Sequence, residues 1–135
     1  MRGLHLTADL RGCAAASAVM TAPAALRSLC LDAVGAAGLT PVGELFHRFA
    51  PGAGGDGPAP SGITGIVLLA ESHLAVHTWP ELGAATLDVY VCNLGADNSA
   101  RAELLLAALI AAFAPASVER HALERGAEPV AAPNA

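Results

Sequence analysis

Lysine is absent from this sequence, because all seven of its basic residues are arginines. Without a lysine amine the chain cannot form the Schiff base that pyridoxal phosphate enzymes use, and it cannot supply the lysine of a Walker-type phosphate loop. Both classes of protein are excluded, and no pyridoxal phosphate is expected. If the protein handles amines through an imine, the carbonyl group has to come from another source.

Positive charge and long apolar runs are also scarce. Seven basic residues stand against twelve acidic ones, which gives a net charge of −5. The chain therefore lacks the basic surface with which nucleic-acid-binding proteins contact phosphates. The longest apolar run, Leu104 to Ala116, is shorter than the roughly 18 residues that a membrane-spanning helix needs. We expect no nucleic-acid partner and no membrane span.

Disulfide bonds are not expected either. The cysteines Cys13, Cys30 and Cys92 are odd in number and widely spaced, which favours free thiols in a reducing compartment. The first twenty residues do not make a good signal peptide, because Asp9 interrupts them and no leucine-rich core follows. We therefore expect a cytoplasmic protein.

The chain has enough apolar residues for one core, since 54% of its 135 residues are hydrophobic, and we expect a single domain over residues 1–135. Alternating or periodic apolar residues predict strands at 3–10, 41–49, 63–70, 73–79, 85–92 and 117–123, and helices at 23–37 and about 97–113. Residues 63–79 are alternatively one bent strand. The glycine- and proline-rich segment 51–62 predicts an irregular loop. This pattern predicts an α+β fold in which two helices pack on one face of an antiparallel sheet.

Three reactive side chains, Glu71, Ser72 and His73, follow directly on the apolar run from Ile66 to Ala70. A second histidine, His77, comes four residues after the first. An unpaired polar group buried in a strand costs on the order of 1 to 3 kcal/mol. The cluster is therefore either chemically active or satisfied by a hydrogen-bond network.

The stretch from Thr64 to Glu81 reads Thr-Gly-Ile-Val-Leu-Leu-Ala-Glu-Ser-His-Leu-Ala-Val-His-Thr-Trp-Pro-Glu, and a cysteine follows twenty residues after its serine. This stretch closely resembles the prokaryotic S-adenosylmethionine decarboxylase proenzymes, a pyruvoyl-dependent family. Weaker similarities lie at 3–13, 46–49 and 124–126. The resemblance implies one domain whose protomers pair as a homodimer, an αββα sandwich with shared pockets.

The resemblance also implies that the chain cleaves itself between Glu71 and Ser72 into chains of residues 1–71 and 72–135. Ser72 would become a pyruvoyl group, which forms a Schiff base with the substrate and supplies the carbonyl that the absent lysines cannot. His77 matches the acid/base of this processing step, and an imidazole suits the proton transfer. Thr64 and His73 match positions that support the processing site. Without the motif, Ser72 would be an ordinary turn residue.

Three further roles carry over from the family. Cys92 matches the thiol that returns a proton to the substrate after decarboxylation, Glu81 matches a carboxylate that holds ribose hydroxyls, and Phe49 matches a ring that stacks on adenine. The ordinary alternatives are a buried inert thiol for Cys92 and a core aromatic for Phe49. A different alternative is a zinc site formed by His73, His77 and Cys92, but the segment has a strand pattern, and we expect no metal.

The sequence departs from the family where substrate is recognised. Leu82, Gly83 and Ala84 replace an aromatic, a glycine and another aromatic, Arg11 replaces an aromatic near Cys13, and the loop 51–62 is longer than usual. We expect a lyase that decarboxylates S-adenosylmethionine, a small-molecule amino-acid substrate, for spermidine synthesis. The alternatives are a pyruvoyl-dependent decarboxylase of ornithine or arginine, and an unprocessed binding or regulatory homologue.

Overall fold

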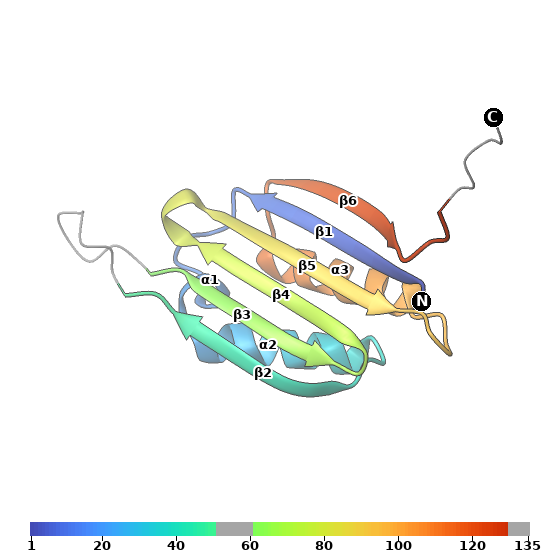
Figure 1. The fold of residues 1–135 in the computed structure, drawn as a ribbon. Helices are drawn as coiled ribbons and strands as arrows, with labels where there is room; N and C mark the ends of the chain where they lie inside the picture. The colour runs from blue at the N-terminus through green and yellow to red at the C-terminus, as the bar shows by residue number, and fades with distance from the viewer. Residues whose placement is uncertain (51–60, 130–135) are drawn as a thin grey trace.

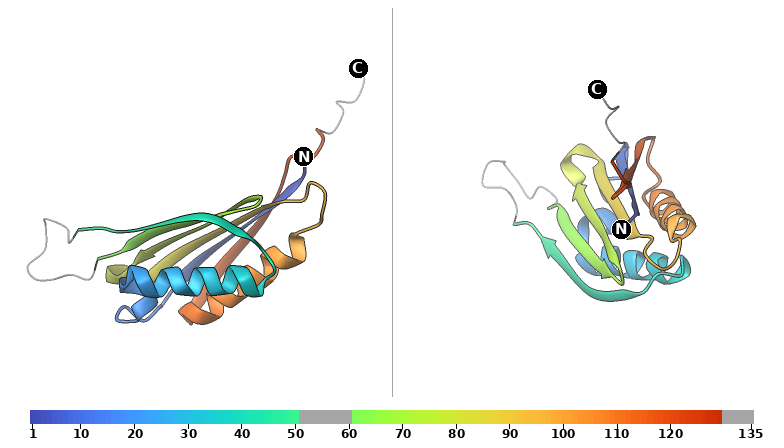
Figure 2. Two further views of the ribbon diagram at one scale, coloured as in Figure 1. Left: turned by 90° about the horizontal axis from the view of Figure 1, so that it is seen from below. Right: turned by 45° about the vertical axis from the view of Figure 1, so that its right-hand side comes forward.

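The computed structural model describes residues 1–50 and 61–129, so that residues 51–60 of the predicted loop lie outside the described part. The chain forms one six-stranded antiparallel sheet in the order β2-β3-β4-β5-β1-β6. Its α-helices lie on one face of the sheet (Figures 1 and 2). The elements are β1 (Gly3–Arg11), α1 (Ala18–Thr21), α2 (Pro23–Ala36), β2 (Pro41–Arg48), β3 (Ile63–Leu69), β4 (Ser72–Trp79), the short 3₁₀ helix η1 (Pro80–Leu82), β5 (Ala84–Cys92), α3 (Ser99–Phe113) and β6 (Ser117–Arg125).

The predicted α+β class and the one-sided helix layer are confirmed. The two predicted helices correspond to α2 and α3, while the four-residue α1 was missed, because so short a segment shows no helical periodicity. The alternative of one bent strand over 63–79 is wrong. Two strands, β3 and β4, form a hairpin in which Leu69 pairs with Ser72.

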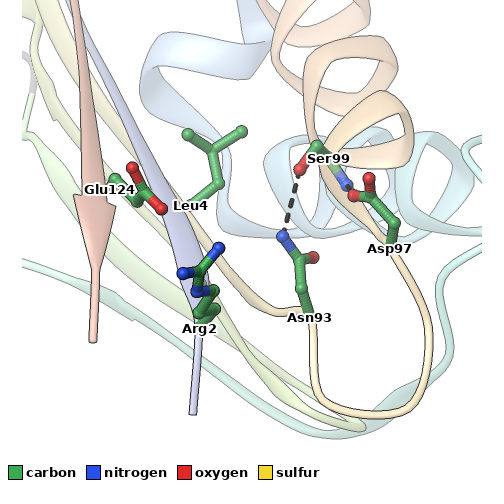
Figure 3. Close-up of a pocket in the computed structure, with 7 residues that line it drawn as sticks. Arg2, Leu4, Asn93, Asp97, Ser99 and Glu124 are labelled. Carbon is green, nitrogen blue, oxygen red and sulfur yellow. Dashed lines mark hydrogen bonds between the residues drawn. The ribbon is translucent and has the colours of Figure 1, made fainter. Parts of the chain in front are cut away.

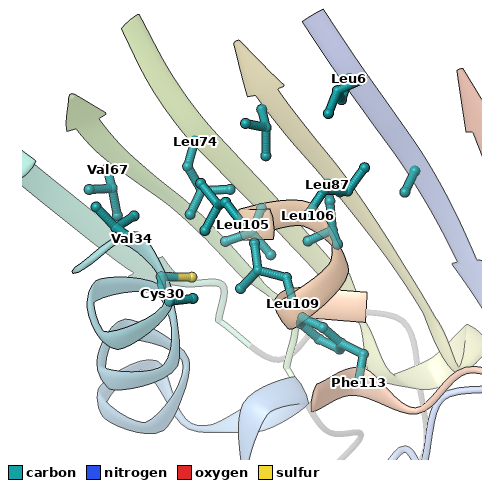
Figure 4. Close-up of a cluster of buried hydrophobic side chains, with 14 of the residues drawn as sticks. Leu6, Cys30, Val34, Val67, Leu74, Leu87, Leu105, Leu106, Leu109 and Phe113 are labelled. Atoms are coloured by element: carbon teal, nitrogen blue, oxygen red, sulfur yellow. The ribbon is translucent and has the colours of Figure 1, made fainter. Parts of the chain in front are cut away.

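The core lies between the sheet and helices α2 and α3 (Figure 4). Alternate residues of the central strands point into it, including Leu6, Val67, Leu74 and Leu87, each at most 1% exposed. Helix α3 contributes Leu105, Leu106, Leu109 and Phe113, and α2 contributes Cys30 and Val34. Each fully buried leucine stabilises the fold by about 1.5 to 3 kcal/mol, so this layer fixes the plane of the sheet.

A buried threonine holds the open end of the β3–β4 hairpin through two hydrogen bonds. Thr78 is 2% exposed, and its hydroxyl donates to the carbonyl oxygen of Met20 at 2.8 Å and accepts from the backbone N–H of Ile63 at 3.0 Å. Among the described residues, no buried side-chain nitrogen or oxygen lacks a partner. Thr78 therefore ties β4 both to α1 and to the start of β3, which fixes the register of the hairpin.

In the part of the chain that the structure describes, no helix or strand covers the face of the sheet opposite the helices (Figure 2). The strand registers place all five histidines on this open face: His5, His47, His73, His77 and His121. Exposed apolar side chains accompany them, with Leu45 69% and Leu68 46% exposed. Within residues 1–50 and 61–129, no helix is both long and apolar enough to cross a membrane.

Candidate active site

Ser72 stands at the first position of β4, directly after the turn that carries Glu71. Its φ angle is 109°, a conformation that L-amino acids rarely adopt. Such a backbone costs on the order of 1 to 3 kcal/mol and persists only where the surrounding structure holds it. Here the strand pairs of Ser72 with Leu69 and with Val91 provide that hold. The bond between Glu71 and Ser72 therefore lies next to a strained residue.

Cys92 lies at the same end of the sheet as Ser72. Because Ser72 pairs with Val91, Cys92 is one residue beyond that pair at the end of β5. Cys92, Ala70 and Glu71 line one cavity of about 350 Å³. The tertiary structure thus brings together the predicted cleavage site and the predicted proton donor, although twenty residues separate Ser72 from Cys92.

His73 belongs to a polar and aromatic network that crosses four strands of the open face, β4, β5, β1 and β6. Its ring meets Tyr90 of β5 edge-on at 5.8 Å, and Tyr90 also contacts His5 of β1 at 5.6 Å between centroids. The guanidinium of Arg125 lies 5.2 Å from the centre of the Tyr90 ring, and Nε2 of His5 lies 3.1 Å from Oδ1 of Asp88. Residue 125 lay within a weak family similarity in the sequence, but the contact of Arg125 with Tyr90 follows only from the pairing of β6 with β1.

Thr64 and His77 form a second pair, on β3 and β4. The hydroxyl oxygen of Thr64 lies 3.1 Å from Nδ1 of His77, directly across the hairpin. His77, however, follows Ser72 by five residues along an extended strand, which separates their Cα atoms by about 16 Å at about 3.3 Å per residue. The His77 imidazole therefore cannot reach the Ser72 hydroxyl of its own chain.

The predicted substrate-binding residues lie farther still from Ser72. Phe49, 51% exposed, follows β2 and donates its backbone N–H to the carbonyl oxygen of Gly62 at 2.9 Å. Glu81 is exposed within η1, just beyond the end of β4. Both residues therefore lie at the opposite end of the sheet, about 23 Å from Ser72 as measured along the seven residues of β4 to Trp79.

Three of the residues expected to depart from the family pattern lie close together. Arg11, Leu82 and Ala84 line a hollow of about 230 Å³ together with Asp9 and Trp79. Arg11 and Ala84 are direct partners across β1 and β5. The sequence did not indicate this meeting, because 73 positions separate Arg11 from Ala84. The substituted residues thus form one altered surface at the Glu81 end of the sheet.

The alternative of a zinc site has no geometric support. Four residues along a strand separate His73 from His77, and their Cα atoms are about 13 Å apart, which is too far for one ion. Within the described ranges, no three histidine, cysteine, aspartate or glutamate side chains are grouped so that they could hold a metal.

A larger hollow of about 410 Å³ lies beside the starts of β1 and α3 (Figure 3). It is lined by Arg2, Gly3, Leu4, Asn93, Asp97, Ser99 and Glu124. In it, the amide nitrogen of Asn93 donates to the Ser99 hydroxyl at 3.1 Å. A backbone hydrogen bond from Ser99 lowers the pKa of the Asp97 carboxyl. None of the predicted site residues lines this hollow, so it is separate from the candidate active site.

Comparison with known proteins gives one consistent family. The sequence model of the family described as S-adenosylmethionine decarboxylase matches residues 4–126. An S-adenosylmethionine decarboxylase proenzyme from Archaeoglobus fulgidus is 33% identical over 124 residues, which cover 92% of this chain and 97% of the relative. One from Aquifex aeolicus is 36% identical over 124 residues, which cover 92% and 81%. The crystal structure of the adenosylmethionine decarboxylase from Aquifex aeolicus matches with a TM-score of 0.78 at 33% identity, covering 98% of this chain and 97% of that chain.

Proposed function

Because the chain belongs to the S-adenosylmethionine decarboxylase family, we propose that it cleaves itself after Glu71 and then decarboxylates S-adenosylmethionine as a pyruvoyl-dependent enzyme. The observation that carries this proposal is the strained Ser72 beside a cavity that Glu71 and Cys92 share. The product would supply aminopropyl groups for spermidine synthesis. We also propose a cytoplasmic location, since all three cysteines are free thiols.

In the processing step, the Ser72 hydroxyl attacks the carbonyl carbon of Glu71 and the peptide C–N bond breaks, which leaves an ester. A base then removes the Cα proton of Ser72, and the Cβ–Oγ bond breaks to release Glu71 as a carboxylate. One water molecule displaces the nitrogen of residue 72 as ammonia and leaves a ketone at the new N-terminus. Ser72 fits this chemistry, since it is half-buried at a turn and directly follows Glu71, which lines a cavity.

A pyruvoyl group at residue 72 would attach the substrate amine and supply the electron sink for the loss of carbon dioxide, the same chemistry that pyridoxal phosphate supplies in other enzymes. Cys92 then donates a proton to the substrate's α-carbon. Its half-buried position at the cavity allows this contact while the side chain remains accessible. A protonated thiol suits the role.

We further propose that the working unit is a homodimer. The separation of about 16 Å between Ser72 and His77 within one chain supports a role for His77 on another copy's Ser72. The open sheet face, with its exposed Leu45 and Leu68, supports a two-fold packing of sheet on sheet, an αββα sandwich. When the two sheets run in opposite senses, the Ser72 end of one faces the end of the other that carries His77, Phe49 and Glu81.

Mixing two inactive variants tests the dimer. Ser72→Ala cannot be cleaved but keeps its His77, whereas His77→Ala keeps its Ser72 but lacks the base. Co-expressed with different affinity tags, the pair should restore cleavage of the His77→Ala chain, which stays slow when that variant is expressed alone. Cleavage no faster in the mixture than in His77→Ala alone would show that the two residues do not work across an interface.

Mass spectrometry and carbon dioxide release test the main proposal. The wild-type protein should consist of chains 1–71 and 72–135 with a ketone at residue 72, and it should release carbon dioxide from S-adenosylmethionine. Ser72→Ala should remain one chain and release none. A wild-type chain that stays intact would instead favour the unprocessed binding or regulatory homologue.

One observation favours a second candidate substrate. The hollow lined by Arg11, Leu82 and Ala84 carries one charged and two aliphatic residues at positions where the family usually has aromatic ones, which weakens the case for a flat adenine ring. The carboxylate of Asp9 would suit the distal cation of ornithine or arginine. Cleaved protein should therefore be assayed with all three substrates, and release of carbon dioxide from ornithine or arginine alone would assign the enzyme to that alternative.

A further inference from the structure

Arg101, in the first turn of α3, borders the cavity that contains the predicted cleavage site. It lines the same 350 Å³ cavity as Ala70, Glu71 and Cys92. Its Nη1 donates to Oδ1 of Asn98 at 2.8 Å, and its Nε would lie 3.4 Å from a side chain built at Gly38. The arginine side chain therefore lies between the start of α3 and the glycine turn after α2.

The charge of Arg101 has no acidic partner in the described part of the chain. Two of the other six arginines do have one, since Arg27 pairs with Glu44 and Arg120 pairs with Glu103. Within residues 1–50 and 61–129, no carboxylate comes within 4.0 Å of the Arg101 guanidinium. A guanidinium can bind a carboxylate through two parallel hydrogen bonds, and the cavity beside Arg101 has room for one.

We propose that Arg101 binds the carboxylate that self-cleavage creates at the backbone of Glu71, the new C-terminus of the 1–71 chain. This inference rests on the proposed self-cleavage. The two oxygens of that carboxylate are the former carbonyl oxygen of Glu71 and the former Oγ of Ser72, and Glu71 lines the same cavity as Arg101. The backbone N–H of Ala70 stays bonded to the carbonyl oxygen of Thr40 at 3.0 Å, so only Glu71 has to move.

Holding this terminus serves the reaction. Cleavage adds a second negative charge to Glu71 beside Cys92 and residue 72, where the carboxylate of the substrate must enter. Arg101 neutralises one charge and keeps the chain end out of the pocket. Binding of the substrate's own carboxylate by Arg101 would slow the reaction, because the ion pair would stabilise the reactant and would be lost as carbon dioxide leaves.

Trimming with carboxypeptidase Y tests the inference on the cleaved protein, with the mass of the 1–71 chain followed over time. Wild type should lose Glu71 slowly, and Arg101→Gln should lose it about tenfold faster or more, because a charge-assisted bond is removed. Arg101→Lys, which keeps the charge but not the paired hydrogen bonds, should be intermediate. Arg120→Gln is the matched control. Arg120 lies on β6 and pairs with Glu103 of α3, away from the cavity, so this variant should be trimmed at the wild-type rate.

The possible results distinguish a failure of this inference from a failure of the proposed self-cleavage. If wild type is never cleaved, the proposed self-processing fails and no terminus exists for Arg101 to bind. If wild type is cleaved but Arg101→Gln is trimmed at the wild-type rate, Arg101 does not hold the terminus. A raised KM for S-adenosylmethionine in that variant would then show that Arg101 binds the substrate instead. If Arg101→Gln remains uncleaved, Arg101→Lys is compared with wild type instead. Trimming of Arg101→Lys at the wild-type rate would then overturn the inference.

Discussion

The hydroxyl of Thr64 and the Nδ1 atom of His77 face each other across the β3–β4 hairpin at a distance of 3.1 Å. This contact fixes the plane of the imidazole ring and leaves Nε2 as the atom that can reach another group. The hydroxyl therefore acts as a positioning group for the proposed acid/base, and removing it should affect processing more than folding.

Thr64→Val keeps the shape of the side chain but removes the hydroxyl. We expect self-cleavage to slow by about tenfold, since a hydrogen bond that orients a reacting group is worth about 1 kcal/mol or slightly more. Thr64→Ser, which keeps the hydroxyl, should cleave at nearly the wild-type rate. The fraction of cleaved chain after synthesis, followed by mass spectrometry, measures both rates. Equal rates for valine and serine would remove Thr64 from the processing site.

Cys92→Ala should separate cleavage from turnover. The variant should still divide into two chains, because the thiol is not needed for ester formation, but its carbon dioxide release should fall by about 100-fold or more with the loss of the proton donor. Cys13→Ala is the control, since Cys13 is buried and burial raises the pKa of its thiol. Full activity of Cys92→Ala would refute the proton-donor role.

Adjacent leucines of α3 should differ strongly in their contribution to stability. Leu105 is fully buried while Leu104 is 61% exposed. Leu105→Ala should lower the free energy of unfolding by about 2 to 5 kcal/mol because it leaves a cavity, and Leu104→Ala should change it by about 0.5 kcal/mol or less. Urea denaturation in the uncleaved Ser72→Ala background measures both. Similar losses for the two variants would contradict the orientation of α3 against the sheet.

Cys30 should make stability fall at alkaline pH. Burial raises the pKa of its thiol to about 12 in the folded protein, whereas the unfolded chain loses the proton near the ordinary value of 9.0. Above that ordinary value the unfolded state binds fewer protons, so stability decreases with pH by up to about 1.4 kcal/mol per unit until the folded pKa is reached. Urea denaturation in the Ser72→Ala background from pH 7 to 10 should show a steeper decline with Cys30 than with Cys30→Ala. Parallel curves of stability against pH for the two proteins would contradict a raised pKa of the Cys30 thiol.

Local sequence patterns alone predicted most of the strands, the two longer helices and the family of this protein. The alternation of Leu87, Val89 and Val91 with polar neighbours predicted β5, and Pro23 with Gly38 bounded α2 closely, because these signals depend on residues that are neighbours in the chain. The long motif around Ser72 likewise identified the family that the comparisons confirm. The absence of lysine restricted the chemistry before any contact was known.

Only the tertiary structure determined which of the predicted site residues lie close to one another. Five positions separate Ser72 from His77 and twenty separate it from Cys92, yet Cys92 is the one nearby. An extended strand moves its residues apart by about 3.3 Å per position, whereas a hairpin returns distant positions side by side. Arg101 was missed for the same reason, because its place at the cavity of Glu71 follows from packing a helix beside the ends of two strands.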